Sequence, residues 1–112
     1  MDTIIRCTAT LASFDSLNVP EKLIDRALEL GLKGVAITDH SCIGAHVRCS
    51  KYAEKIQEEH PDFKVALGEE SYLCDSRDKG QYYYHQVFIA KDLIGHKLIR
   101  ELSSISWMKG YW

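Results

Sequence analysis

The most constraining feature of this sequence is the short apolar run KGVAIT at 33–38, which ends in Asp39 and His40. It stands between two stretches with the apolar spacing of amphipathic helices. A short, nearly continuous apolar run is typical of a strand buried on both faces of a parallel sheet. Parallel neighbours need crossover connections, which helices usually provide. The run therefore predicts an α/β fold in which helices cover a sheet.

Strand-like and helix-like segments alternate along the rest of the chain. They are expected in the order β-α-β-α-β-β-α, at 3–8, 20–30, 33–38, 45–59, 64–73, 82–90 and from 93 onward. Asn18 is the expected N-cap of the first helix, Gly31 its stop, and Asp92 the N-cap of the last helix. The pattern predicts a single domain over residues 1–112. Its fold class is α/β, with about four largely parallel strands, three main helices and right-handed crossovers.

Composition narrows the class of protein. A chain of 112 residues suits one hydrophobic core, and a net charge of −2 excludes a broad basic surface for nucleic acid. Its four cysteines, Cys7, Cys42, Cys49 and Cys74, show no CxxC spacing, so reduced thiols are expected. The start has no signal-peptide pattern, and no apolar run approaches the roughly 18 residues of a membrane span. The sequence therefore predicts a globular cytoplasmic protein.

Polar side chains gather where the expected strands end. They are Arg6 and Thr8 with the nearby Asp15, then Asp39 and His40, then Glu69 and Glu70; His85 lies within the fourth strand. Carboxylates and imidazoles that converge from several strand ends suit a divalent metal ion. Simpler interpretations remain open: His85 as a hydrogen-bonded core histidine, the TDH triplet as a helix cap, and GEE as a solvated loop start.

Three segments resemble the PHP (polymerase and histidinol phosphatase) domain, above all the PHP domains at the N-terminus of bacterial DNA polymerase III alpha subunits. They are DSLNVPEKLIDRALELGLKGVAITDH, ALGEESYL and YHQVFIAKDLIGHKLIRELSSISWMKGYW. The resemblance implies a distorted barrel of βα units with a metal cluster at the strand ends. Active members hydrolyse phosphoesters with divalent ions. The chain is therefore expected to form part of a PHP-type (βα) barrel.

The resemblance implies a partial ligand set. With Asp15 as the anchor, Arg6 and Thr8 occupy the positions of the two histidines of the first motif. His40, Glu70 and His85 match later ligands, and the distal motifs have no counterpart before Trp112. Arginine stays protonated and offers no lone pair to a metal. We expect Arg6 to pair with Asp15 or Glu70, and the metal site to be vestigial.

The resemblance thus favours a catalytically degenerate domain without a tightly bound cofactor. The alternative is a residual metal-dependent phosphoesterase or nuclease that holds manganese or zinc weakly through Asp15, His40, Glu70 and His85. Activity would need an open coordination position and an activated water.

About four strands cannot close a barrel, so an open sheet edge and an apolar face are expected to need cover. A protein partner or self-association across that edge is favoured. Trp107, Tyr111 and Trp112 are the interface candidates, with folding of these rings onto the domain as the alternative. Arg77 and Lys79 beside three tyrosines could also stack on single-stranded nucleic acid, but packing is the commoner role of such a segment.

Three functions follow from these expectations. The first is a protein-binding module or inhibitor, virus-encoded and directed at a replication or nucleic-acid-processing factor. The second is the residual phosphoesterase. The third is the N-terminal structural piece of a DNA polymerase III alpha subunit.

Overall fold

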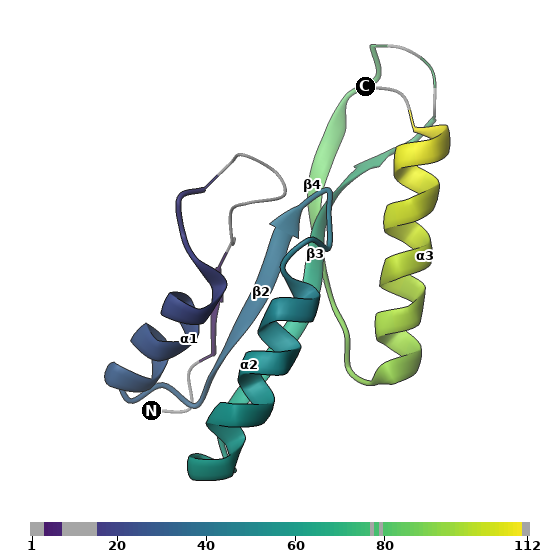
Figure 1. Cartoon of the computed structure of the whole chain (residues 1–112). Coiled ribbons are helices and arrows are strands. Elements are labelled where there is room, and N and C mark those ends of the chain that lie inside the picture. The colour runs from purple at the N-terminus through teal and green to yellow at the C-terminus, as the bar shows by residue number, and fades with distance from the viewer. Residues whose placement is uncertain (1–3, 8–15, 77, 79, 111–112) are drawn as a thin grey trace.

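The computed structural model describes residues 4–76, 78 and 80–110, apart from 8–15 and the side chains of 4–7. The elements run in the order that the sequence predicts (Figure 1). They are β1 (Ile4–Cys7), α1 (Pro20–Glu29), β2 (Gly34–His40), α2 (His46–Glu59), β3 (Lys64–Cys74), β4 (Tyr83–Ile89) and α3 (Leu93–Lys109).

The described strands form one mixed sheet in the order β1-β2-β3-β4. β1 and β3 both pair with β2 in parallel, whereas β4 pairs with β3 antiparallel. The first three strands are parallel, as the expected largely parallel sheet requires, and the fourth makes the sheet mixed. The reason is the short link at 75–82, because a parallel crossover needs about a dozen residues or more. Closure into a barrel is not shown by these strands, which form an open sheet.

The long strand β3 pairs with a different neighbour along each of its two parts. Its first part, Lys64–Glu70, pairs with β2, and its second part, Gly68–Cys74, pairs with β4. Asp39 is the register partner of Glu69, and His40 is the partner of Glu70. Because successive side chains of a strand point to opposite faces, the two pairs lie on opposite sides of the sheet.

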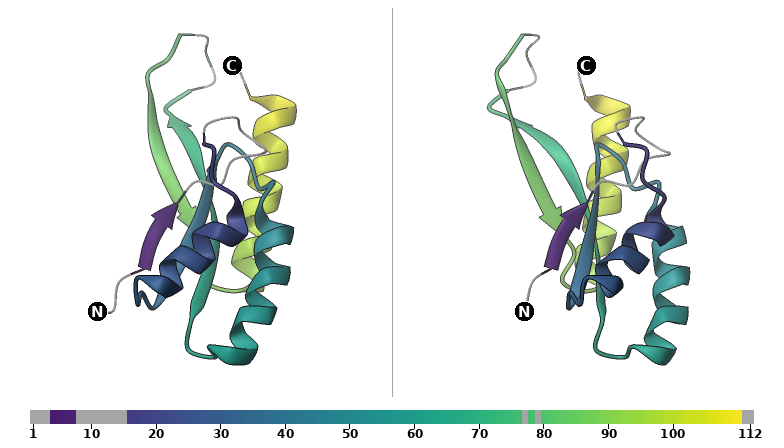
Figure 2. Two further views of the ribbon diagram at one scale, coloured as in Figure 1. Left: turned by 60° about the vertical axis from the view of Figure 1, so that its left-hand side comes forward. Right: turned by 90° about the vertical axis from the view of Figure 1, so that its left-hand side faces the viewer.

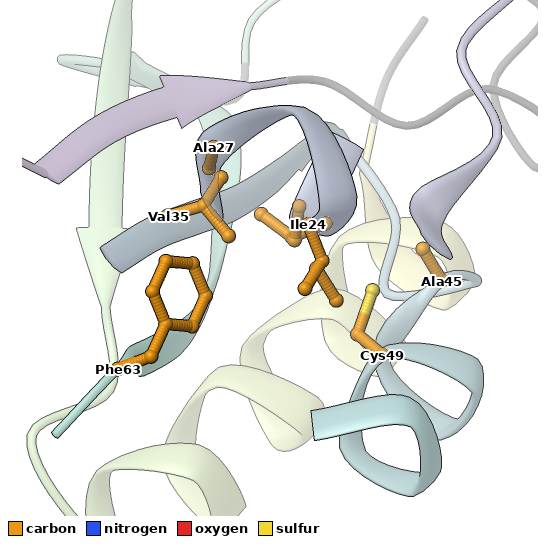
Figure 3. Packing of buried hydrophobic residues seen from close by; sticks show 7 residues of the cluster. Ile24, Ala27, Val35, Ala45, Cys49 and Phe63 are labelled. Atoms are coloured by element: carbon orange, nitrogen blue, oxygen red, sulfur yellow. The ribbon is translucent and has the colours of Figure 1, made fainter. Parts of the chain in front are cut away.

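The helices lie on one face of the sheet (Figure 2). Between that face, α1 and α2 lies the hydrophobic core, seen from close by in Figure 3: Ile24, Ala27, Val35, Ile37, Ala45, Cys49 and Phe63. Burial raises the pKa of the Cys49 thiol to about 12, so this cysteine is an inert packing residue. Cys42 and Cys74 are also free thiols.

The second helix buries fewer residues than its apolar pattern suggests. Cys49 and Ala53 are buried, but the apolar Val47 is 66% exposed. Residues two apart on a helix do not share a face, so Val47 cannot point inward together with Cys49.

The ends of the helices agree only in part with the sequence. Asp92 caps α3 as predicted, since its side chain accepts a hydrogen bond of 2.8 Å from the backbone N–H of Gly95. The N-cap of α1 is Val19 and not Asn18, whose amide groups instead donate to the Ser16 hydroxyl. Pro20 takes the first helical position, so the cap falls one residue later than predicted.

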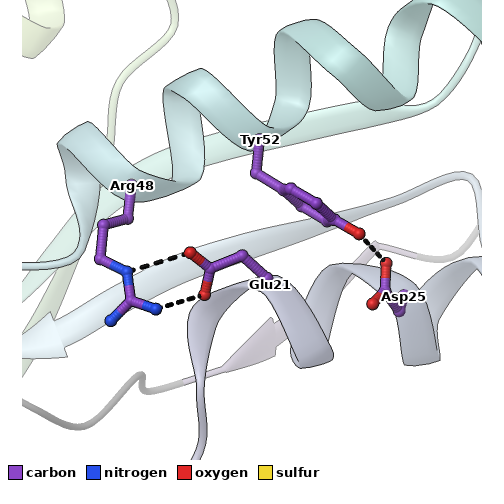
Figure 4. A network of polar contacts seen from close by, with 4 residues as sticks. All are labelled: Glu21, Asp25, Arg48 and Tyr52. Atoms are coloured by element: carbon purple, nitrogen blue, oxygen red, sulfur yellow. Dashed lines mark hydrogen bonds and ion pairs between the residues drawn. The ribbon is translucent and has the colours of Figure 1, made fainter.

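Two polar contacts join α1 to α2 (Figure 4). The guanidinium of Arg48 donates two hydrogen bonds, of 3.0 and 2.7 Å, to the Glu21 carboxylate. The Tyr52 hydroxyl donates to Asp25 over 2.6 Å. Because the ion pair is partly solvated, it orients the helices more than it stabilises them. None of the described helices is both long enough and apolar enough to cross a bilayer.

Candidate functional site

Three of the four predicted metal ligands lie close together on the face of the sheet opposite the core. His85 Nδ1 is 2.8 Å from Glu70 Oε1, so the imidazole donates and the carboxylate accepts. The ring centroid of His40 lies 5.4 Å from that of His85, with the two planes nearly parallel. Tyr72 packs edge-on against both rings, at 4.8 and 5.0 Å. The structure thus gathers two imidazoles, one carboxylate and a phenol.

Strand register explains this grouping. His40 ends β2 beside Glu70 of β3, and Tyr72 of β3 faces His85 of β4. Directly after His40, Ser41 adopts a left-handed backbone with φ of 53°, which is uncommon for a residue other than glycine. Its N–H donates to the Glu70 carbonyl over 2.8 Å, and its carbonyl accepts from Trp107 Nε1 over 2.6 Å. The turn that presents His40 is therefore held by both β3 and α3.

The rest of the predicted set is only partly described. Thr8 and Asp15 lie outside the described residues, as do Tyr111 and Trp112, and only the backbone of Arg6 is described. The pairing of Arg6 with Asp15 or Glu70 therefore stays a prediction. Arg6 is the register partner of Ala36. Among the described residues, no three His, Cys, Asp or Glu side chains are arranged to hold a metal ion. The metal site also stays a prediction.

Asp39 and Glu69, which precede the site residues His40 and Glu70 in the chain, belong to the interior instead. Asp39 and Glu69 are fully buried, on the side of the sheet that the helices cover. Burial raises the pKa of Glu69, and the hydroxyls of Ser103 and Ser71 offset part of that effect. Those hydroxyls lie near the carboxyl group, although neither Glu69 oxygen makes a well-aligned hydrogen bond within the described structure. Strand alternation thus separates Glu69, an interior group under α3, from Glu70, a site group.

A pair of histidines, one of them buried, was missed by reasoning from the sequence. His46, 3% exposed, has its Nε2 2.8 Å from the Gly68 carbonyl and its Nδ1 3.0 Å from His96 Nε2. A carbonyl only accepts, so His46 carries its proton on Nε2 and its Nδ1 accepts from His96. The pair ties α2 and α3 to β3. The spacing of His46 with Cys49 and Ala53 along one helix face was the signal that could have revealed its burial.

Acid is expected to weaken this histidine contact. Burial lowers the pKa of His46 below its usual 6.5, and the neighbouring His96 adds to the effect, whereas the hydrogen bond to Gly68 opposes it. The unfolded chain therefore binds a proton more readily than the folded one. Stability from this group is complete above pH 6.5 and is lost as the pH falls below 6.5 toward the folded pKa.

Urea unfolding between pH 7.5 and 5 measures this effect, with His46→Gln as the control. Glutamine can still donate to the Gly68 carbonyl but does not titrate. The free energy of unfolding should fall more steeply with acid in the wild type than in the variant. Glu69 contributes with the opposite sign, but equally in both proteins. Parallel pH profiles would show that His46 does not titrate between the two states.

The comparisons with known proteins match this fold. The family model of the PHP domain covers residues 8–112. The chain belongs to the PHP domain family. In an alignment of 109 positions that covers 88% of the chain, it is 34% identical to the probable DNA polymerase YorL of Bacillus subtilis and equally to a DNA-directed DNA polymerase of Bacillus phage SPbeta. In an alignment of 97 positions that covers 80% of the chain, it is 27% identical to the DNA polymerase III alpha subunit of Borreliella burgdorferi.

This PHP domain corresponds to a small part of those polymerases, since the match spans 8% of the length of each. Among solved structures, it resembles a protein from Bifidobacterium adolescentis proposed to be a metal-dependent phosphoesterase. The TM-score is 0.56 at 19% identity, over 94% of this chain and 35% of the other. That similarity supports the fold alone.

Proposed function

We propose that this PHP domain is a catalytically degenerate unit that serves DNA replication by binding a protein partner. One observation carries the proposal: an arginine occupies β1 at the register position beside Ala36 of β2, the strand that ends in His40. The resemblance to the first PHP motif assigns a histidine ligand to this position. A guanidinium supplies positive charge and no lone pair, so it replaces a metal ligand with a group that repels a metal ion.

The contact between Glu70 and His85 supports the same proposal. His85 donates from Nδ1 to the carboxylate over 2.8 Å, so that nitrogen carries the proton and only Nε2 keeps a lone pair. A metal ion would have to compete with this hydrogen bond for Glu70. The two residues thus satisfy each other without an ion.

A long apolar stripe on α3 supports a protein partner. Ile94, Leu98, Leu102 and Ile105 follow helical spacing, and all four are 37–73% exposed. Trp107, one of the predicted interface residues, is 60% exposed even though its indole donates to Ser41. Trp107 lies in the last turn of α3, which ends at Lys109. Exposed aliphatic and aromatic side chains of this kind favour association.

Two forms of this proposal remain. The domain can act as a structural part of a DNA polymerase, as its similarity to three polymerases suggests. It can also act as an inhibitor directed at a replication factor, in line with its similarity to a phage polymerase. Co-purification with a labelled replicative polymerase complex separates them, since an inhibitor must bind a complex that already contains its own PHP domain.

A residual metal-dependent phosphoesterase is the second candidate, favoured by the grouping of His40, Glu70 and His85. The deciding experiment titrates manganese and zinc into metal-free protein and assays hydrolysis of p-nitrophenyl phosphate, with the His40→Ala/His85→Ala double variant as control. We expect substoichiometric metal and the same background hydrolysis from both proteins. Stoichiometric metal with turnover that the double variant lacks would overturn the degenerate assignment.

A further inference from the structure

A groove of about 560 Å³ lies beside the second half of β3, between the β3–β4 hairpin and the last turns of α3. Past His40 the pairing with β2 ends, so this stretch of β3 has no partner on that edge among the described strands. Figure 2 shows the hairpin projecting beyond β2 in this region. Ser41, at the end of β2, also borders the groove. The volume falls within the range of about 300–1,000 Å³ that is typical of small-molecule sites.

The walls of the groove are aromatic on one element and aliphatic on another. Tyr72 and Tyr83 of the hairpin line it, with ring centroids 4.3 Å apart and planes at 60°. Leu102 and Ile105 of α3 also line it. Tyr83 is 50% exposed and Ile105 is 49% exposed, so both remain accessible. A slot with phenol rings and branched aliphatic side chains suits a flat, apolar-faced ligand.

Charged side chains are few in the described lining of the groove. They are one carboxylate, Asp78, and one ammonium group, Lys109. Arg77 and Lys79, on either side of Asp78, lie outside the described residues. Gln81 adds a side-chain amide, which both donates and accepts hydrogen bonds. Aromatic and aliphatic walls with one amide together fit a flat heterocycle with polar edges.

We propose that this groove binds a single nucleobase, either of a free nucleoside or at the exposed end of a single strand. Tyr83 stacks on the base, Leu102 and Ile105 cover it, and Gln81 hydrogen-bonds its edge. The site is distinct from the cluster of His40, Glu70 and His85, although Tyr72 borders both. Leu102 and Ile105 also belong to the apolar stripe of α3, so a protein partner seated on that part of the stripe would compete with the base.

The test is calorimetric titration with adenosine and, separately, with a five-residue oligo-dA. Stacking of a base on an aromatic side chain contributes about 1–3 kcal/mol, so Tyr83→Ala should weaken binding by roughly 5- to 150-fold. Tyr84→Ala is the matched control. Tyr84 is the next residue on β4 and is equally accessible at 59%, but it packs on Tyr82 and does not line the groove. The affinity of the Tyr84→Ala variant for either probe should stay within roughly twofold of wild type.

Ile105→Glu provides a second variant at an exposed position, where folding should be preserved, and it should abolish binding by placing a charge in the slot. Melting curves of each variant verify folding. Similar affinity for adenosine and the oligonucleotide identifies a nucleoside site, and much tighter oligonucleotide binding identifies a strand-end site. No saturable binding of either probe would overturn the proposal. So would oligonucleotide binding that salt abolishes and Tyr83→Ala leaves unchanged, because phosphates would then drive it.

Discussion

Gly68→Ala is expected to destabilise the domain by about 3 kcal/mol or more. A Cβ at this position would overlap the backbone carbonyl oxygen of Phe88 in β4 and would lie 3.0 Å from the Thr38 side chain. The Phe88 oxygen belongs to the backbone, so β4 itself would have to shift. Gly68 also stands where β3 is paired on both sides, with Thr38 of β2 and Ile89 of β4. The substitution should therefore loosen the hairpin that carries His85.

Urea denaturation measures this loss, with Gly95→Ala as the matched control. A Cβ at Gly95 would meet only ordinary contacts at 3.6 Å and beyond. Since alanine is favoured over glycine within a helix by up to about 1 kcal/mol, the control should be neutral or stabilising. Equal midpoints for wild type and Gly68→Ala would show that β3 and β4 approach each other less closely than the structure indicates.

The Arg6→His/Thr8→His double substitution is expected to raise manganese affinity at least roughly tenfold. Loss of an outer-shell partner alone commonly costs 10- to 100-fold in metal affinity, so the gain of two direct imidazole ligands should reach at least the lower end. The change also removes the positive charge of Arg6, which would oppose a cation at the position that the resemblance assigns to this residue. The two histidines restore the residue types of the first PHP motif beside His40, Glu70 and His85.

Calorimetric titration with manganese measures the gain. The same double substitution in a His40→Ala/His85→Ala background is the control, and it should bind no more tightly than wild type. Unchanged affinity in the restored protein would mean that Arg6 and Thr8 do not occupy ligand positions. Tight binding in the unaltered protein would mean that the site was never lost.

Reasoning from the sequence located most of the elements and three residues of the candidate site. His40 and Glu70 stand where strands were expected to end and His85 within the fourth strand, and the structure brings the three together. The Asp92 cap follows from local chemistry, because a side chain and the N–H three residues later are neighbours whatever the rest of the chain does. The same reasoning grouped Glu69 with Glu70, and it overlooked His46 entirely. Both errors concern which way a side chain faces once a neighbouring helix covers it.

The sequence by itself determined the family and the order of strands and helices. These properties depend on residue identity and on neighbours within a few positions. Only the tertiary structure decided that β4 runs antiparallel, that Glu69 lies under α3, and that His46 joins Gly68 to His96. It also decided that Tyr83 and Ile105 line one groove. Each of these depends on which distant residues share a face, and that is set by strand register and helix packing rather than by local pattern.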